Sequence, residues 1–145
     1  MTKPKPKSPA VPPAAVLERA YPTGAPLALV ELVREGVPWS TYQGTVADLG
    51  LTDQAAAVVL HIPARTLARR KGGRLEPQES ERFMRLVRLA AQAAEVLGSR
   101  QKAQHWLETP NRALQGVTPL SLLDTDIGTQ AAEAVLTRID YGVYS

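Results

Sequence analysis

The stretch from residue 52 to residue 73 constrains the fold more than any other part of the chain. Thr52 is a typical helix N-cap, and the alanine-rich run after it predicts a helix. Residues 61–62 interrupt this helix, and a second one is predicted to begin near Pro63 and to end at Gly72. Two helices joined by so short a turn predict a helix-turn-helix motif.

The second helix of this motif is basic, with no acidic residue between Leu60 and Leu75. Arg65 and Arg69 lie one turn apart and share a face. An arginine can bind a guanine edge in the major groove, and a threonine can contact a phosphate or a thymine methyl group. A solvated basic surface without a partner is the alternative. The predicted DNA-binding side chains are Arg65, Thr66, Arg69, Arg70, Lys71 and Arg74.

Charge and composition support an all-α protein with two functional halves. Residues 1–75 contain ten Lys and Arg against five Asp and Glu, whereas residues 76–145 contain seven against nine. The basic first half therefore favours a polyanionic partner, and the second half does not. Only 5% of the residues are aromatic, so the core must consist of Leu, Val and Ala, which favours packed helices over a sheet.

Three segments follow from the residue pattern. Residues 1–25 hold six of the twelve prolines and three lysines, and this density of proline predicts a disordered tail. Residues 26–84 predict the helix-turn-helix domain, and residues 85–145 predict a second, small helical domain.

Helices are predicted on both sides of the motif. A short one starts at Pro26 and ends near Gly36, and a long one starts at Pro77 and ends at Gly98. The apolar face of the short helix is predicted to consist of Leu27, Val30, Leu32 and Val33. Three arginines of the long helix lie off its apolar stripe and are predicted to be solvated: Arg82, Arg85 and Arg88.

The last forty residues contain several helix start signals. The pairs Thr109-Pro110 and Thr118-Pro119 each predict the start of a short helix, and residues 124–126 predict the start of the final one. The inward face of the final helix is predicted to comprise Ile127, Ala131, Ala134, Val135 and Ile139. Leu136 falls on another flank, where it is predicted to contact something besides the core.

Several classes of function lack the residues they need. No run reaches the roughly 18 to 20 apolar residues of a membrane span, and the chain has no cysteine, so we expect a cytoplasmic protein. His61 and His105 lie in different helices without a carboxylate pattern, which predicts neither a metal site nor a cofactor. Because no Ser/His/Asp arrangement, Gly-rich phosphate loop or carboxylate pair is recognisable, an enzyme is not expected.

The quoted residues resemble a known family. The helix-turn-helix is similar to the Xre/Cro-like type, although His61 stands where glycine is frequent and Pro63 where a Ser or Thr cap is usual. The second half resembles the C-terminal domain of Xre/MbcA/ParS antitoxins. The residues that carry this resemblance are Trp106-Leu107-x-Thr109-Pro110-Asn111, Thr118-Pro119-Leu120-x-Leu122-Leu123 and Tyr141-Gly142-Val143-Tyr144-Ser145.

The resemblance implies an antitoxin of a type II toxin–antitoxin system. Its implied partner is a RES-domain toxin that degrades NAD, blocked at its active-site entrance by the antitoxin's C-terminal end. The helix-turn-helix is implied to bind operator DNA and to repress the shared operon, as a homodimer within a larger assembly. The toxin-binding residues are then expected to be Leu136, Arg138, Tyr141, Gly142, Val143, Tyr144 and Ser145.

Two alternatives remain open from the residues. Tyr141 and Tyr144 can pack back on the region of Trp106 instead of entering a toxin. The chain can also be a stand-alone transcriptional regulator whose C-terminal domain only dimerises.

Overall fold

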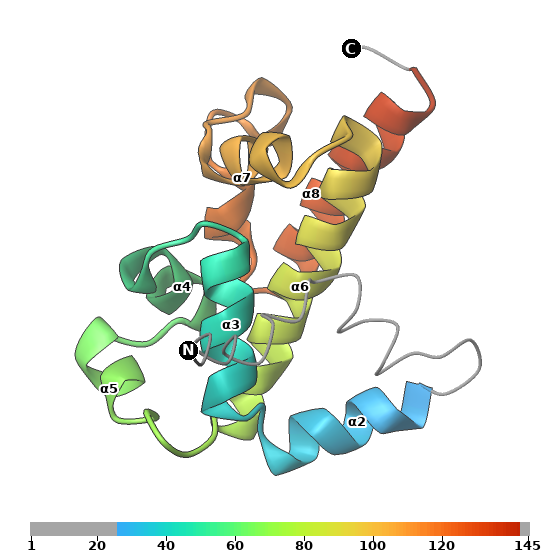
Figure 1. Ribbon diagram of the computed structural model, residues 1–145. Coiled ribbons are helices and arrows are strands. Elements are labelled where there is room, and N and C mark those ends of the chain that lie inside the picture. The colour runs from blue at the N-terminus through green and yellow to red at the C-terminus, as the bar shows by residue number, and fades with distance from the viewer. Residues whose placement is uncertain (1–25, 143–145) are drawn as a thin grey trace, which may run out of the picture.

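The computed structural model describes residues 26–142 and is all-helical, with no β-strand in this range (Figure 1). The predicted tail at residues 1–25 and the predicted toxin-binding residues Val143, Tyr144 and Ser145 lie outside it. The α-helices are α2 (Pro26–Glu35), α3 (Trp39–Asp48), α4 (Asp53–Leu60), α5 (Ala64–Ala68), α6 (Pro77–Leu97), α7 (Arg100–Glu108) and α8 (Asp126–Asp140). Two 3₁₀-helices, η1 (Arg112–Leu114) and η2 (Pro119–Leu122), connect α7 with α8.

Helix α6 is the central element, and it packs against α2, α4, α7 and α8. It starts with a capping box in which the backbone nitrogen of Glu76 donates to Glu79 Oε1 at 2.9 Å. It ends at Gly98, which takes a left-handed conformation. The side chains of its inward stripe are buried: Phe83, Leu86, Val87, Leu89, Ala90 and Ala93. The predicted start at Pro77 and the predicted stop at Gly98 are therefore confirmed.

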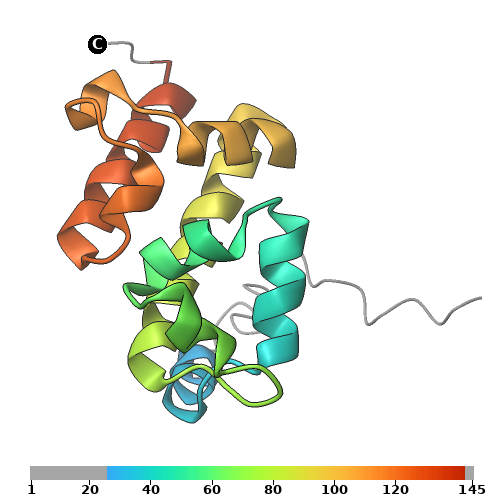
Figure 2. The same cartoon turned by 90° about the vertical axis from the view of Figure 1, so that its left-hand side faces the viewer.

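The first half of the fold gathers α2 to α5 around the beginning of α6 (Figures 1 and 2). Tyr42 is fully buried, and its ring lies 4.8 Å from that of Trp39 and 5.7 Å from that of Phe83, measured between centroids. Backbone bonds from Leu75 N to Val37 O and from Trp39 N to Gly73 O, both 2.9 Å, fasten the segment after α5 to the segment before α3.

Helix α2 forms where the sequence predicts it, but its apolar face is rotated. Leu27 is 74% exposed and Val30 is 38% exposed, whereas Leu32 and Val33 pack partly against the core. A ten-residue helix that touches its neighbours along only one side can bury few of its apolar side chains, and the pattern alone did not show which ones.

The second half places α7, η1, η2 and α8 around the end of α6. Thr118 caps η2 by accepting a bond from Ser121 N at 3.2 Å, as the sequence predicts. The prediction that Thr109-Pro110 starts a helix is wrong. Thr109 is the C-cap of α7 and its hydroxyl donates to His105 O, while Asn111 caps the following 3₁₀-helix.

The prediction of a solvated arginine row on α6 is wrong for Arg82 and Arg85, whereas Arg88 is exposed as predicted. Arg82 donates to Leu60 O at 3.2 Å, and Arg85 donates to Leu123 O and Asp124 O at 3.3 and 3.2 Å. Arg88 pairs with Glu133 of α8 at 2.8 Å. Arginine side chains are long enough to leave their own helix and reach carbonyl groups of its neighbours. These residues therefore hold α4 and α8 against the central helix.

Candidate functional site

The helix-turn-helix consists of α4, a sharp turn and α5. The hydroxyl of Thr52 caps α4 by accepting from Ala55 N at 3.1 Å, which confirms the predicted N-cap. His61 ends α4 in the left-handed conformation with a φ of 57°, as expected for a residue at a position where glycine is frequent. Leu67 is buried and anchors α5.

Helix α5 ends at Ala68, so the prediction that the second helix runs to Gly72 is wrong. The next residues form tight turns, with Arg70 N bonded to Leu67 O at 3.0 Å and Gly73 N to Arg70 O at 2.9 Å. The chain then reaches Leu75, whose backbone N–H bonds to Val37 O. Three basic residues that were predicted on the helix therefore lie beyond its last residue: Arg69, which is the C-cap, Arg70 and Lys71.

Three of the predicted DNA-binding residues present a free cationic surface. Arg65, Arg69 and Lys71 are exposed, and none forms an ion pair with the part of the chain that the structure describes. Thr66 is half-buried beside them. Side chains that are positive, exposed and uncommitted are available to phosphates and to base edges.

Arg70 differs from these residues because it is directed into the fold. Its Nε and Nη2 donate to the two carboxylate oxygens of Glu79 at 2.9 and 2.8 Å, in a pair of which only 21% and 6% of the side chains are exposed. The hydrogen bond from Arg70 lowers the pKa of Glu79, and the backbone bond from Glu76 lowers it further. Arg70 therefore fixes the turn after α5 to the start of α6.

Arg74 is also held by the protein. Its Nη1 donates to Gly36 O at 2.9 Å, although the residue remains exposed. The predicted DNA-binding set thus divides into an outward group on α5 and the turn after it, and an inward group that positions this turn.

The end of α8 carries the predicted residues of the second half. Tyr141 is 77% exposed and Gly142 is exposed with a φ of 70°. Arg138 is exposed as well, with Nε bonded to Ala134 O at 3.4 Å. Nothing in the described residues holds Tyr141 against Trp106, so the packed-back arrangement is not seen for this tyrosine.

Leu136 requires a correction. It is fully buried together with Thr129, Ala132 and Val135, so the prediction that its flank is free is wrong. The predicted inward face is confirmed for Val135 and Ile139, which pack in the core, and wrong for Ile127, which is 81% exposed, and for Ala131 and Ala134, which are exposed too. Helix α8 is rotated relative to the prediction.

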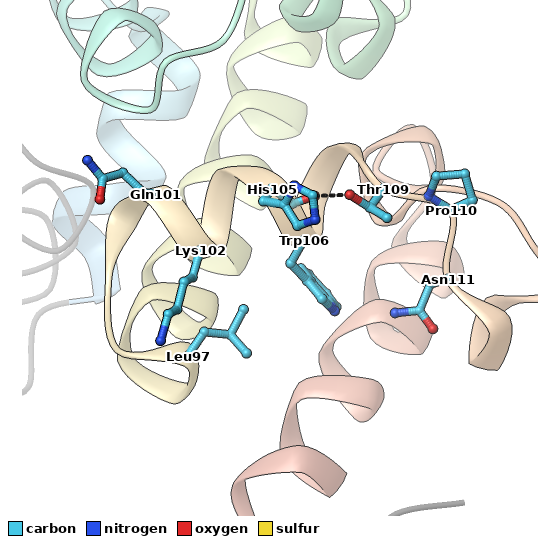
Figure 3. Close-up of a pocket in the computed structure, with 8 residues that line it drawn as sticks. All are labelled: Leu97, Gln101, Lys102, His105, Trp106, Thr109, Pro110 and Asn111. Carbon is cyan, nitrogen blue, oxygen red and sulfur yellow. Dashed lines mark hydrogen bonds between the residues drawn. The ribbon is translucent and has the colours of Figure 1, made fainter.

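A pocket of about 460 Å³ lies beside α7 and was not expected from the sequence (Figure 3). Its wall is mainly apolar, and the indole of Trp106 projects into it, with a buried Nε1 that has no hydrogen-bond partner among the described residues. The side chains that line it are Leu97, Gln101, Lys102, His105, Trp106, Thr109, Pro110 and Asn111. A tryptophan beside a helix end is the only sequence signal for such a site.

The described residues contain no group of three or more His, Asp or Glu residues that could hold a metal ion. Within the same range, no helix combines the length and the apolar character needed to cross a membrane.

Comparison with known proteins places both halves in one family. Residues 28–88 match the antitoxin Xre-like helix-turn-helix domain, and residues 92–142 match the antitoxin Xre/MbcA/ParS C-terminal toxin-binding domain. The mycobacterial cidal antitoxin MbcA of Mycobacterium tuberculosis is 32% identical over 107 residues, which are 72% of this chain and 93% of that protein. This chain belongs to the Xre/MbcA/ParS antitoxin family.

Two other antitoxins are also similar in sequence to this chain. The antitoxin Xre of Yersinia enterocolitica is 39% identical over 87 residues, which are 58% of this chain and 59% of that protein. The chain therefore matches less than two thirds of that relative's length. A Prs ADP-ribosylating antitoxin of a Sphingobium species is 24% identical over 138 residues, which are 88% of this chain and 87% of that protein.

The two matched domains meet inside α6. The outward cations of α5 belong to the helix-turn-helix match, and Tyr141 and Gly142 are the last residues of the toxin-binding match. One rigid helix thus connects the two candidate surfaces.

Proposed function

We propose that this chain neutralises a toxin by direct binding and represses its own operon. Its partner is a RES-domain protein that degrades NAD, and the C-terminal end from Arg138 onward covers the entrance of the toxin's active site. The antitoxin acts by binding and not by catalysis. The observation that carries this proposal is the exposed end of α8, with Tyr141 and Gly142 projecting from a domain that matches a toxin-binding domain.

The chemistry of this end suits a nucleotide-sized cleft. A tyrosine offers a large contact area with few rotatable bonds and a polar tip. Gly142 has the left-handed φ that lets the chain turn away from the helix axis. One relative is named a Prs ADP-ribosylating antitoxin, and ADP-ribosyl transfer ordinarily uses NAD as its donor. That name supports a toxin whose substrate is NAD.

The DNA-binding half acts through the outward cations. Arg65 lies on α5, and Arg69 follows one turn later as the C-cap of this helix. Both are exposed, so they can enter a major groove together. We propose that Lys71 contacts a phosphate at the edge of this surface. A homodimer within a larger toxin–antitoxin assembly would read two half-sites separated by about 34 Å, which is one turn of DNA.

The test measures inhibition of the toxin encoded in the same operon. Purified toxin is incubated with NAD and the full-length chain, and the loss of NAD and the transfer of ADP-ribose to protein are both followed. Full-length protein should stop NAD loss, and a chain lacking residues 141–145 should not. The truncated chain should still bind operator DNA, which shows that it folds.

Three results would oppose the proposal. Inhibition that survives removal of residues 141–145 contradicts the role of the tail. A toxin that transfers ADP-ribose without net NAD hydrolysis contradicts the assignment of its activity. Failure of the full-length chain to bind any neighbouring gene product, together with specific DNA binding, would favour a stand-alone regulator.

A further inference from the structure

Helix α8 carries a second apolar face that points away from the core. Ile127, Ala131, Ala134, Arg138 and Tyr141 follow one another at intervals of four, three, four and three residues, which places them on one line along the helix. All five are exposed, Ile127 by 81% and Tyr141 by 77%. This line is called the outer stripe of α8 below.

The outer stripe is not needed for the fold. The opposite side of α8 already buries Ala132, Val135 and Leu136 against the rest of the domain. Glu133 occupies one flank of the helix and pairs with Arg88 of α6 at 2.8 Å. In the isolated chain, Ile127 leaves four fifths of its surface exposed, in line with two exposed alanines.

The tail alone is too short to form a stable interface with a toxin. Residues 141–145 are five residues, whereas a specific protein interface usually takes about 20 to 30 residues from each side. The outer stripe ends at Tyr141, the first residue of the proposed tail, and the whole stripe lies inside the match to the toxin-binding domain. Fifteen residues of α8 extend this surface by about 22 Å.

We propose that the toxin docks along the outer stripe of α8, so that the helix positions the tail at the active site. This inference rests on the proposed function and adds a docking surface on α8 to the tail, so that both contribute to the affinity for the toxin. Ala131 and Ala134 allow a toxin helix or ridge to approach the α8 backbone closely, between the larger Ile127 and Tyr141. The toxin surface is apolar in its middle and offers a carboxylate opposite Arg138.

A matched pair of substitutions tests the stripe. Ala134→Arg places a long, charged side chain in the middle of the proposed interface. Ala47→Arg makes the same change at an exposed position of α3, on the other side of the molecule from α8 (Figure 2). Both positions are exposed and helical, so both variants should melt near the wild-type temperature.

Affinity for the purified toxin is measured by titration calorimetry with the full chain. Ala134→Arg should weaken binding by about tenfold or more, and Ala47→Arg should leave it unchanged. Ile127→Gln is the second variant, since it removes apolar contact without adding charge, and it should also weaken binding. Toxin affinity equal to wild type in both stripe variants would overturn the inference.

The outcomes separate this inference from the proposed function. A wild-type chain that binds no toxin overturns both. Toxin inhibition that depends on residues 141–145 but not on Ile127 or Ala134 overturns only the docking stripe. A third result would assign the stripe to a second copy of this chain: Ala134→Arg changes the sedimentation of the free antitoxin from dimer to monomer and leaves toxin affinity intact, which also overturns the inference.

Discussion

At the scale of single residues, the basic run after α4 is not uniform. Arg65, Arg69 and Lys71 are exposed and unpaired among the described residues, whereas Arg70 forms a two-bond pair with Glu79. Neighbouring residues in a turn point in different directions, so adjacent arginines can serve folding and binding separately. The sequence predicted these cations. Which of them is directed into the fold depends on the position of Glu79 in space, which the sequence does not show.

Glu79→Gln should destabilise the protein. Breaking a buried ion pair costs about 3 to 5 kcal/mol, and the amide of Gln keeps part of the hydrogen bonding, so we expect a loss of about 1 to 3 kcal/mol. Urea unfolding at pH 7 measures it. Glu95→Gln, at an exposed position of the same helix, is the control and should change the free energy of unfolding little.

The effect of Glu79→Gln should depend on pH. Arg70 lowers the pKa of Glu79 in the folded state, so its carboxylate stabilises the fold fully above the unfolded pKa of about 4.3. This contribution is lost as the pH falls through the lower, folded pKa. The difference in unfolding free energy between wild type and variant should therefore shrink on acidification below about pH 4. A difference that stays constant down to pH 2.5 would contradict the pair's role.

Replacing Arg65 and Arg69 together by alanine should weaken operator binding. Each arginine that contacts a base is worth about 1 to 3 kcal/mol, so a loss of at least tenfold in affinity is expected in a gel-shift assay at moderate salt. Arg112→Ala removes an exposed arginine from the second half and serves as the control. Neutralisation of the toxin should be unaffected by either change. Unchanged operator affinity in the double variant would place the reading surface elsewhere.

At the scale of elements, the start of α8 depends on Gly128. A Cβ atom there would lie 2.2 Å from Leu122 O and 2.9 Å from Thr125 Oγ1, the atom that caps the helix. Gly128→Ala should therefore displace η2 or the helix start and lower the free energy of unfolding by about 1 to 3 kcal/mol. Gly73→Ala meets its nearest neighbour at an ordinary 3.6 Å and should cost less. Equal melting temperatures for the two variants would contradict the close approach.

Local signals were predicted well, and orientation was not. The caps at Thr52 and Thr118 and the stop at Gly98 depend on bonds within a few residues, so the sequence shows them directly. The rotation of α8 does not, because this helix is apolar on two sides and only its neighbours decide which side is buried. The apolar positions of α8 predict one inward face that includes Ile127, but only Val135 and Ile139 of this face pack in the core.

At the scale of the whole molecule, Arg85 joins the two halves. Its side chain is 15% exposed and donates to the carbonyls of Leu123 and Asp124 just before α8. Arg85→Ala should leave those carbonyls without this donor and lower stability by about 1 to 3 kcal/mol. Arg88→Ala breaks only a surface pair with Glu133 and should cost less than about 1 kcal/mol. Thermal unfolding measures both variants. A larger loss of stability from Arg88→Ala than from Arg85→Ala would contradict the role of Arg85 in joining the two halves.

The candidate site was predicted in part at this scale. The sequence indicated two candidate surfaces, the cations after α4 and the end of α8, because the motif and the family resemblance depend on short stretches of residues. It could not show which elements pack around α6, or that Leu136 belongs to the core. Those facts depend on how distant elements pack together.

The central claim is that one chain binds a toxin at one end and DNA at the other. Co-expression with the toxin of the same operon, followed by size-exclusion chromatography with light scattering in the presence of operator DNA, tests it most directly. We predict a single species that contains toxin, antitoxin and DNA, and that loses only the toxin when residues 141–145 are removed. Elution of the full-length chain with DNA but never with toxin would contradict the account.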